Sequence, residues 1–215
     1  MRIGIVSDVH CDAEGLAAAL ARLGSVDLLL CAGDMVLQYR FSDEVIALLR
    51  ERDALAIQGN HDRILLSPHG DGVRRAGRGA PEHWAWLADQ PAQRRLAVDG
   101  WRLLLAHGTP WDDPTDLHCT YLYPHDTAKL RRLADCDAEI VVLGHTHFPM
   151  LLQQNGTLAI NPGSCGEARD RGLLTYGLID TVATTAAIYR LDAGHEGELL
   201  CEAPLPEPSG SGAPS

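Results

Sequence analysis

The first third of the chain alternates short apolar runs with segments that carry leucines at helical spacing. Runs rich in β-branched residues are typical of buried strands, and a period near 3.6 is typical of amphipathic helices. The order of strand, helix, strand, helix, strand predicts a parallel α/β sheet. The expected elements are a strand within residues 2–10, a helix at 13–23, a strand at 26–32, a helix from the N-cap Ser42 to about Arg52, and a strand at 55–58.

The rest of the chain contains two strong hairpin signals, Asp99-Gly100 and Asn155-Gly156, each between two apolar runs. A Gly- and Arg-rich segment at 67–80 predicts a loop, and Pro81 predicts the start of a helix. The last two strands are expected to complete a second sheet. The expected elements are a helix at 81–89, strands at 94–98 and 101–106, a helix at 125–134, and strands at 139–143, 150–153, 158–161, 173–179 and 183–189.

The length of 215 residues suits one domain, which we expect to span residues 1–200. Residues 201–215 are rich in Pro, Gly and Ser. Such a segment buries too little apolar surface to order itself, so it is expected to form a mobile tail.

The chain has 29 acidic and 18 basic residues, which give a net charge of −11. This charge argues against non-specific binding to nucleic acid or to an anionic membrane, although bound metal cations would still allow a phosphate substrate. No apolar run approaches the roughly 20 residues that span a bilayer, and no secretory signal opens the chain. The six cysteines show no CxxC pair, which favours reduced thiols. We therefore expect a soluble, cytoplasmic protein.

Polar side chains follow several of the expected strands. Asp8 and His10 lie two residues apart, a spacing that in an extended segment directs both side chains to the same side. A single such pair has ordinary explanations, among them a simple turn or a hydrogen-bonded histidine. The repetition at the carboxyl ends of strands, where open α/β sheets bind ligands, predicts one shared site. Its members are Asp8 with His10, Asp34, Asn60 with His61, His107, and His145 with His147.

These groups are carboxylates, imidazoles and one amide, and no thiolate is among them. That donor set suits Mn, Fe, Zn or Ni and argues against a purely structural zinc site.

Five blocks of sequence carry a resemblance to a known family. They are Asp8-x-His10, Gly33-Asp34, Gly59-Asn60-His61-Asp62, His107-Gly108 and Gly144-His145-x-His147. Together they resemble the signature blocks of the calcineurin-like metallophosphoesterases, and more narrowly the small bacterial and archaeal phosphodiesterases of that superfamily. The resemblance implies an α/β fold, a four-layer αββα sandwich of two mixed β-sheets flanked by helices.

The resemblance also implies two divalent transition-metal ions, with Mn expected and Fe, Zn or Ni as alternatives. Asp8, His10 and His147 would hold one ion, Asn60, His107 and His145 the other, and Asp34 would bridge them. In relatives a metal-bridging hydroxide attacks phosphorus. His61, beside Asn60 and oriented by Asp62, is the candidate general acid, and the alternative is that His61 only contacts the phosphate.

The leading hypothesis is a metal-dependent phosphodiesterase acting on a small phosphate ester. A phosphomonoesterase of small metabolites is the alternative. The arginines that relatives acting on phosphoproteins carry beside the second and third blocks are missing, which disfavours that branch. A non-catalytic protein-interaction scaffold predicts missing ligands, whereas every ligand position is filled here. Assembly into a homo-oligomer is left open.

Two features near the blocks have open interpretations. Cys11 stands where many relatives carry glycine, and it either touches the metal pocket or is simply a tolerated small residue. The aromatic side chains of the segment 111–124, Trp111, Tyr121 and Tyr123, either stack on a substrate ring or fill core beneath an irregular loop. The segment 161–164 resembles a loop near the site in relatives, and its expected role is structural.

Overall fold

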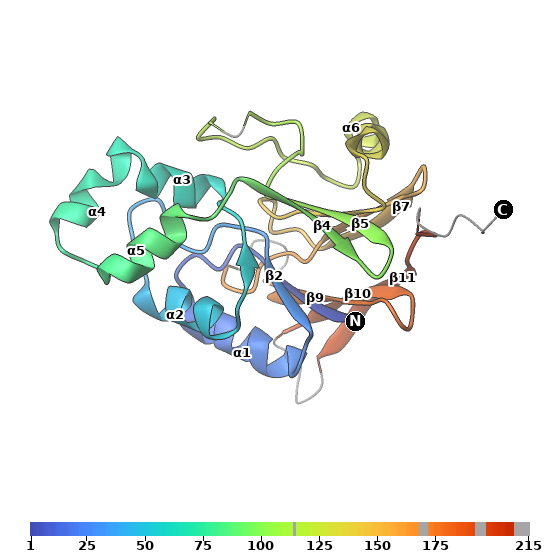
Figure 1. The fold of residues 1–215 in the computed structure, drawn as a ribbon, viewed down its shortest axis with the longest axis horizontal. Coiled ribbons are helices and arrows are strands. Elements are labelled where there is room, and N and C mark those ends of the chain that lie inside the picture. The colour runs from blue at the N-terminus through green and yellow to red at the C-terminus, as the bar shows by residue number, and fades with distance from the viewer. Residues whose placement is uncertain (114, 168–171, 192–196, 209–215) are drawn as a thin grey trace.

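The computed structural model describes residues 1–113, 115–167, 172–191 and 197–208 of the chain. Two mixed β-sheets lie face to face with helices on their outer sides, as the family resemblance implies (Figure 1). The first sheet has the order β11 (Glu198–Pro204), β10 (Thr185–Arg190), β9 (Thr175–Asp180), β1 (Arg2–Val6), β2 (Leu28–Cys31), β3 (Leu55–Ala56). The second has the order β4 (Gln93–Val98), β5 (Trp101–Ala106), β6 (Ile140–Val142), β8 (Thr157–Asn161), β7 (Met150–Gln154).

The predicted parallel unit forms one half of the first sheet, from β1 to the edge strand β3. β1 pairs with β2 in parallel, with Ile5 opposite Leu30, and β2 pairs with β3 in parallel. The connecting helices are α1 (Ala13–Leu23) and α2 (Asp43–Glu51), both close to the predicted bounds. Both hairpins are also confirmed, because β4 pairs with β5 and β7 with β8 in antiparallel fashion.

Alternation along β1 explains the layering. Ile3 and Ile5 point into the apolar cluster between the two sheets, where they join side chains such as Leu103 and Ile160. Val6 instead belongs to the cluster that packs the first sheet against α1 and α2. A third cluster lies between the second sheet and the segment of α6 (Thr127–Arg132) and η2 (Leu133–Cys136). Because the inner strands are covered on both faces, β1, β2, β6 and β8 are almost entirely buried, whereas the edge strands β4 and β11 are largely exposed or half-buried.

The prediction that the last two strands complete the second sheet is wrong. β9 pairs with β1 in antiparallel fashion, with Ile5 opposite Gly177, and β10 follows β9. The hydrophobic pattern identifies a strand and its faces but not the strand it pairs with. Gly177 suits this pairing, since a Cβ there would lie 3.3 Å from Ile5 Cβ and 3.4 Å from Pro162 Cβ.

The start of the predicted tail needs a correction, because residues 201–204 form the second half of β11. Cys201 lies opposite Ile188 of β10, and Leu205 beyond the strand is buried. The indole Nε1–H of Trp101 donates to the carbonyl of Pro206 at 2.7 Å, which fixes this segment over the second sheet. Residues 209–215 of the predicted tail lie outside the described residues.

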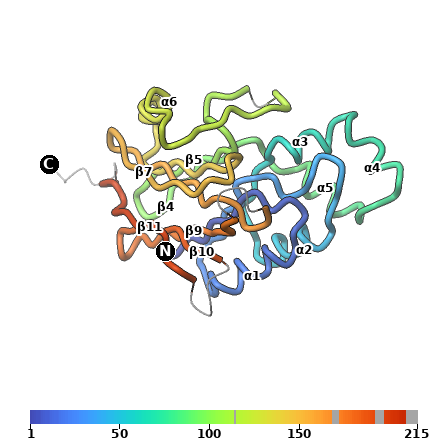
Figure 2. Tube along the Cα trace, turned by 180° about the vertical axis from the view of Figure 1, so that it is seen from behind, coloured from blue at the N-terminus to red at the C-terminus, as the bar shows by residue number. Residues whose placement is uncertain are grey.

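The predicted loop at 67–80 contains short helices. α3 (Asn60–Leu66) leads into η1 (Pro68–Gly70) and α4 (Asp71–Arg75), and α5 (Pro81–Ala88) begins at its expected proline. Helices α3, α4 and α5 gather at the end of the molecule that lies away from β11, as both views show (Figures 1 and 2). In the described part of the chain, no helix combines the length and the apolar character needed to cross a bilayer.

The N-cap of α2 gives a testable prediction about the fold. The Ser42 hydroxyl accepts the backbone N–H of Val45 at 3.3 Å in a nearly buried position. Ser42→Ala should lower the free energy of unfolding by about 1 kcal/mol, and Ser42→Gly by only a few tenths. Urea unfolding with an unchanged m-value measures both. Ser25→Ala, in an exposed loop, is the control, and equal stability of Ser42→Ala and wild type would contradict the assigned cap.

Candidate metal centre

The polar residues predicted to share a site come together where strands of the two sheets end. Asp8, Asp34 and Asn60 follow β1, β2 and β3, while His107 and His145 follow β5 and β6. Because the site takes residues from both sheets, its geometry depends on how the sheets pack. The structure brings together every side chain predicted as a ligand, and His61 lies with them.

The candidate ligands form two groups. The first contains Asp8, His10 and His147, and the second contains Asp34, Asn60, His107 and His145. Asp34 also lies near the first group. In the first group, His147 Nε2 is 3.2 Å from Asp8 Oδ1 and 2.9 Å from His10 Nε2. His10 Nε2 is also 3.9 Å from Asp34 Oδ2.

In the second group, His107 Nε2 lies 3.2 Å from Asp34 Oδ2 and 3.2 Å from Asn60 Oδ1. Potential ligand atoms of Asp34, His107 and His145 all lie within 4.8 Å of one another. The carboxylate of Asp34 therefore lies between the two groups.

Backbone carbonyls orient three of the histidines. His107 Nδ1 bonds to the carbonyl of Ala32 at 2.6 Å, and His147 Nδ1 to that of Glu167 at 3.1 Å. His145 uses the opposite nitrogen, since its Nε2 bonds to the carbonyl of Cys119 at 3.0 Å. A carbonyl only accepts, so each of these nitrogens carries a proton, and in a neutral imidazole the other ring nitrogen keeps a lone pair. This arrangement is typical of histidines that bind metals. His107 differs in charge, because burial favours its neutral form but the neighbouring Asp34 outweighs burial and raises the pKa of His107 well above its usual range.

The donor set fits metal ions. His10 Nε2 and His147 Nε2 face each other at 2.9 Å, and the buried Nδ1 of His10 has no hydrogen-bond partner among the described residues. Buried polar atoms in proteins almost always have partners. A cation placed between the two facing Nε2 atoms and the nearby carboxylate oxygens would bind the Nε2 lone pairs, whereas the Nδ1 of His10 lies on the other side of its ring.

Burial sets the charge states of the site. Burial lowers the pKa of His10 and of His145 to about 4, so both imidazoles are neutral at pH 7. Burial alone would raise the pKa of Asp34, but the neighbouring His107 overcomes it and holds that pKa well below its usual range. Neutral imidazoles and an ionised carboxylate are the forms that bind divalent metals.

The backbone at the site is strained. Asp8, His10, Asp34, His145 and His147 have φ values of 53°, 50°, 54°, 70° and 57°, in the left-handed region. Residues other than glycine adopt this region at a cost of about 1–3 kcal/mol each, and such residues cluster at functional sites.

Two glycines permit the close approach of the loops. A Cβ on Gly33, which has a φ of 93°, would lie 2.8 Å from His107 Nδ1, and a Cβ on Gly59 would lie 2.1 Å from Asp34 Oδ1. Any side chain at either position would push one of the two candidate ligands away.

Asp62 holds the backbone around His61. Its buried carboxylate accepts the N–H groups of Val36 and Gly59 at 3.0 and 2.9 Å, and that of Met35 at 3.3 Å. Burial, followed by the charge of Asp34, raises the pKa of Asp62 to about 7. The ring of His61 is oriented instead by the backbone N–H of Gln38, which donates to its Nδ1 at 3.4 Å.

The structure explains Cys11. Its Sγ accepts the N–H of Leu37 at 3.4 Å and donates to the carbonyl of Arg40 at 3.2 Å, so it anchors the turn that carries Gln38. Burial raises the pKa of this thiol to about 11. A protonated, buried thiol is a poor target for oxidation, and the role of Cys11 is to hold the turn.

The segment after His107 covers the site from one side. Trp111 packs against the third apolar cluster under the guanidinium of Arg132, and Tyr123 is half-buried beside Phe148. Tyr121 differs, because it stacks on His145 with ring centroids 4.1 Å apart. Of the three aromatic side chains with open interpretations, Trp111 and Tyr123 therefore pack against protein, whereas Tyr121 lies at the site.

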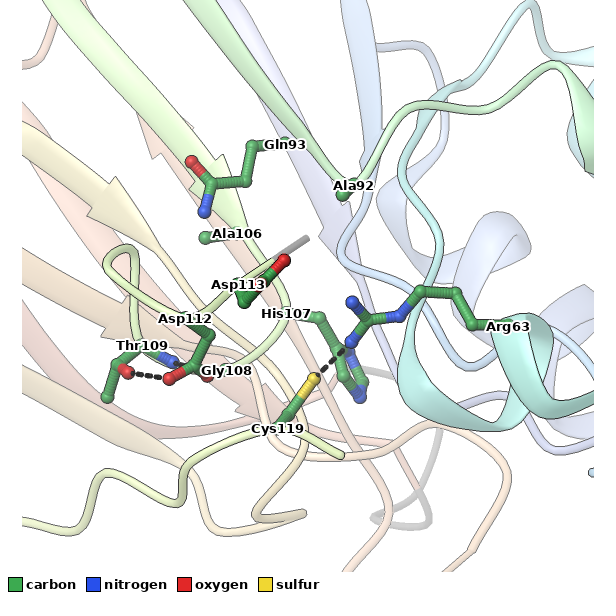
Figure 3. Close-up of a pocket in the computed structure, with 10 residues that line it drawn as sticks. All are labelled: Arg63, Ala92, Gln93, Ala106, His107, Gly108, Thr109, Asp112, Asp113 and Cys119. Carbon is green, nitrogen blue, oxygen red and sulfur yellow. Dashed lines mark hydrogen bonds between the residues drawn. The ribbon is translucent and has the colours of Figure 1, made fainter. Parts of the chain in front are cut away.

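A small pocket lies beside His107, between α3 and this segment (Figure 3). Its volume is about 10 Å³, room for about one water molecule, so it does not hold a substrate. Arg63 reaches across from α3, and its Nη2 lies 2.6 Å from Cys119 Sγ. The contact fastens the segment to the helix that begins with Asn60.

Four residues important to the site were missed by the sequence analysis. Ala32, Cys119 and Glu167 act through backbone carbonyls, and Gln38 acts through a backbone N–H. Any residue type supplies these groups, so the sequence carries no signal for them. The carboxylate of Glu167 also lies 3.7 Å from His10 Nε2. The predicted structural role of Asn161 agrees with the structure, since its Nδ2 donates to the carbonyl of Gly144 at 2.6 Å and to Thr146 Oγ1 at 3.0 Å.

Comparison with known proteins assigns the chain to a family. Residues 1–184 match the calcineurin-like phosphoesterase superfamily domain, and the chain therefore belongs to that superfamily. A probable metallophosphoesterase from Methanothermobacter thermautotrophicus is 28% identical over 173 residues, which cover 76% of this chain and 77% of the relative.

Solved structures agree with the fold. A metallophosphoesterase from Sphaerobacter thermophilus superimposes with a TM-score of 0.72 at 25% identity, covering 90% of both chains. A structure described as a novel archaeal phosphodiesterase has a TM-score of 0.60 at 22% identity, covering 88% of this chain and 99% of that one. The family implies divalent metal ions, and the candidate ligand groups above are where they would bind.

The position of Asp34 predicts the metal content. Asp34→Asn keeps the shape of the side chain and removes its charge, so it should weaken the site where two cations share one carboxylate. Elemental analysis after dialysis against Mn²⁺ should give two ions per wild-type chain and one or fewer for the variant. Asp53→Asn, in an exposed turn with a φ of 48°, is the matched control and should keep both ions. Two ions in Asp34→Asn would contradict a bridging role.

Proposed function

We propose that this protein is a dinuclear metal-dependent phosphodiesterase. In this proposal Asp8, His10 and His147 hold one ion, and Asn60, His107 and His145 hold the other. The observation that carries the proposal is the buried carboxylate of Asp34 between two groups of facing donor atoms. When bound, two such ions neutralise charge on a phosphoryl group and lower the pKa of a shared water towards neutrality.

His61 is the proposed general acid for the leaving alkoxide. The N–H of Gln38 points at Nδ1 of His61, which favours the tautomer with its proton on Nε2. The ring also meets His10 edge-on, with centroids 4.8 Å apart, so it borders the first group of ligands. Its partial exposure leaves a path to a substrate. In this scheme Asn60 binds metal, Gln38 orients the ring of His61, and Asp62 holds the backbone of Gly59 and of the turn that carries Gln38.

The donor set supports Mn²⁺ as the metal, with Fe, Zn or Ni as alternatives. Each proposed group mixes imidazole nitrogens with carboxylate or amide oxygens and contains no thiolate. Oxygen ligands suit Mn²⁺, whereas imidazole suits the later transition metals as well.

A diester is the preferred substrate class. A phosphomonoester carries a second negative charge at neutral pH, and the arginines that relatives acting on phosphoproteins carry beside the second and third blocks are missing from this chain. Arg63 is the one arginine of α3, and its side chain donates to the carbonyl of Gly59 and to Cys119 Sγ. This arrangement favours a singly charged phosphodiester over a monoester.

The proposed reaction takes place in the cytoplasm and needs one chain. All six cysteines are free thiols, which suits a reducing compartment. The proposed ligands, acid and positioning residues all come from the same chain, so the site requires no partner subunit.

The role of His61 predicts a dependence on the leaving group. His61→Ala should slow hydrolysis of a diester with an alkyl leaving group by about 10²–10⁴-fold, because an alkoxide needs a proton to depart. The loss of rate on bis(p-nitrophenyl) phosphate should be much smaller, since p-nitrophenolate departs without being protonated. Turnover of both substrates by the Mn²⁺-loaded protein measures the difference.

Two controls accompany this experiment. His69→Ala, at an exposed position on η1, should behave as wild type, and the metal content of His61→Ala should remain at two ions. Equal losses on both leaving groups would overturn the acid role and leave His61 as a phosphate contact. Faster turnover of p-nitrophenyl phosphate than of the diester by wild type would overturn the diester preference.

A further inference from the structure

Tyr121 is unusual among the large apolar side chains of the protein. In the described residues, five such side chains are exposed, namely Met1, Tyr39, Tyr121, Val182 and Leu199. Tyr121 is 46% exposed, and its ring stacks on His145 at a centroid distance of 4.1 Å and an interplanar angle of 15°. An aromatic ring open to solvent therefore lies directly beside a proposed metal ligand.

Hydrogen bonds hold the chain firmly on both sides of this ring. Before it, the Cys119 carbonyl accepts from His145, and the N–H of Thr120 donates to Asp112 Oδ2 at 2.7 Å. After it, Lys129 Nζ donates to the carbonyl of Tyr121 at 2.6 Å. Figure 3 shows the further contact of Cys119 with Arg63. The ring is thus preorganised, and little conformational freedom is lost when a ligand packs against it.

Packing accounts for the other aromatic side chains of this segment but not for Tyr121. Trp111 lies beneath Arg132 and Tyr123 contacts Phe148, so both are partly covered by protein. Tyr123 continues a row of nearly parallel rings, with its centroid 5.9 Å from that of Tyr121 and an angle of 14°. Tyr121 thus has His145 against one face and Tyr123 as a nearly parallel neighbour, and the exposed part of its ring offers aromatic surface against which a planar ligand can pack face-on or edge-on.

We propose that Tyr121 binds a planar ring of the substrate, and that the substrate is a nucleotide-sized phosphodiester carrying a nucleobase or similar ring. This inference rests on the proposed phosphodiesterase function and names its substrate class. The net charge of −11 disfavours a long polyanion, whereas one phosphodiester with one ring fits a metal centre bordered by a single open aromatic side chain. Stacking accepts any base, so the site selects for a ring and not for a base sequence.

The competing role for Tyr121 is to position His145 alone. The two roles differ in their dependence on the substrate, because a positioning residue affects every ester equally. Methyl p-nitrophenyl phosphate and thymidine 5′-(p-nitrophenyl phosphate) share a leaving group and differ only in the group that is retained. The ratio of their kcat/KM values therefore reports contact between the protein and the thymine ring, and it does not depend on how the leaving group departs.

The experiment compares the two esters with the Mn²⁺-loaded wild type, Tyr121→Leu, Tyr121→Phe and Tyr39→Leu. Wild type should prefer the thymidine ester, and Tyr121→Leu should lose about tenfold in kcat/KM on that ester through KM, the size of one lost stack. The ratio of kcat/KM for the thymidine ester to kcat/KM for the methyl ester should therefore fall by about tenfold in this variant. Tyr121→Phe should retain the preference. Tyr39→Leu, which removes the other exposed tyrosine, should behave as wild type.

Several outcomes would overturn the proposal. They are an absent preference in wild type, an equal loss on both esters in Tyr121→Leu, and the same loss of preference in Tyr39→Leu. Calorimetry with thymidine 5′-monophosphate and inorganic phosphate separates this inference from the proposed function. If wild type hydrolyses neither ester, the proposed function fails. The stacking role still stands if the nucleotide binds about tenfold more tightly than phosphate and Tyr121→Leu removes that difference, and it falls if the two ligands bind equally.

Discussion

The buried carboxylate of Asp34 is the constraint on which the site depends. It lies 3.2 Å from His107, which follows a strand of the second sheet, and 3.9 Å from His10, which follows the central strand of the first. A carboxylate can be ionised in such a place only if positive charge surrounds it. The left-handed backbone at five candidate ligands and the two close glycines all serve to bring donors around this group. The sheets supply the rigid frame that holds these strained loops.

Much of this arrangement was predictable from the sequence because it follows from local chemistry. Short apolar runs, the first of them rich in β-branched residues, identified the parallel unit of β1, β2 and β3, and Asp-Gly and Asn-Gly identified the two hairpins. Polar residues directly after strands identified the candidate ligands, since the carboxyl ends of parallel strands meet at one edge. Every predicted ligand lies in the site, although the assignment of each to a particular ion is still a prediction.

The features that the sequence could not predict are those that depend on contacts between residues far apart along the chain. The pairing of β9 with β1, and the addition of β11 beyond the expected domain end, depend on which edges are free after the sheets form. The sequence predicts no helix at α3, because its start is set by Asp62 accepting the N–H of Gly59, within a block that is interpreted as site residues after a strand. The carbonyls of Ala32, Cys119 and Glu167 orient the histidines, and a backbone group has no signature in a sequence.

The central claim is that two metal ions bind on either side of Asp34. Anomalous diffraction from crystals of the Mn²⁺-loaded protein tests it directly. The account predicts two peaks about 3.5–4 Å apart, one among Asp8, His10 and His147 and one among Asn60, His107 and His145. A single peak, or two peaks that do not share Asp34, would contradict it.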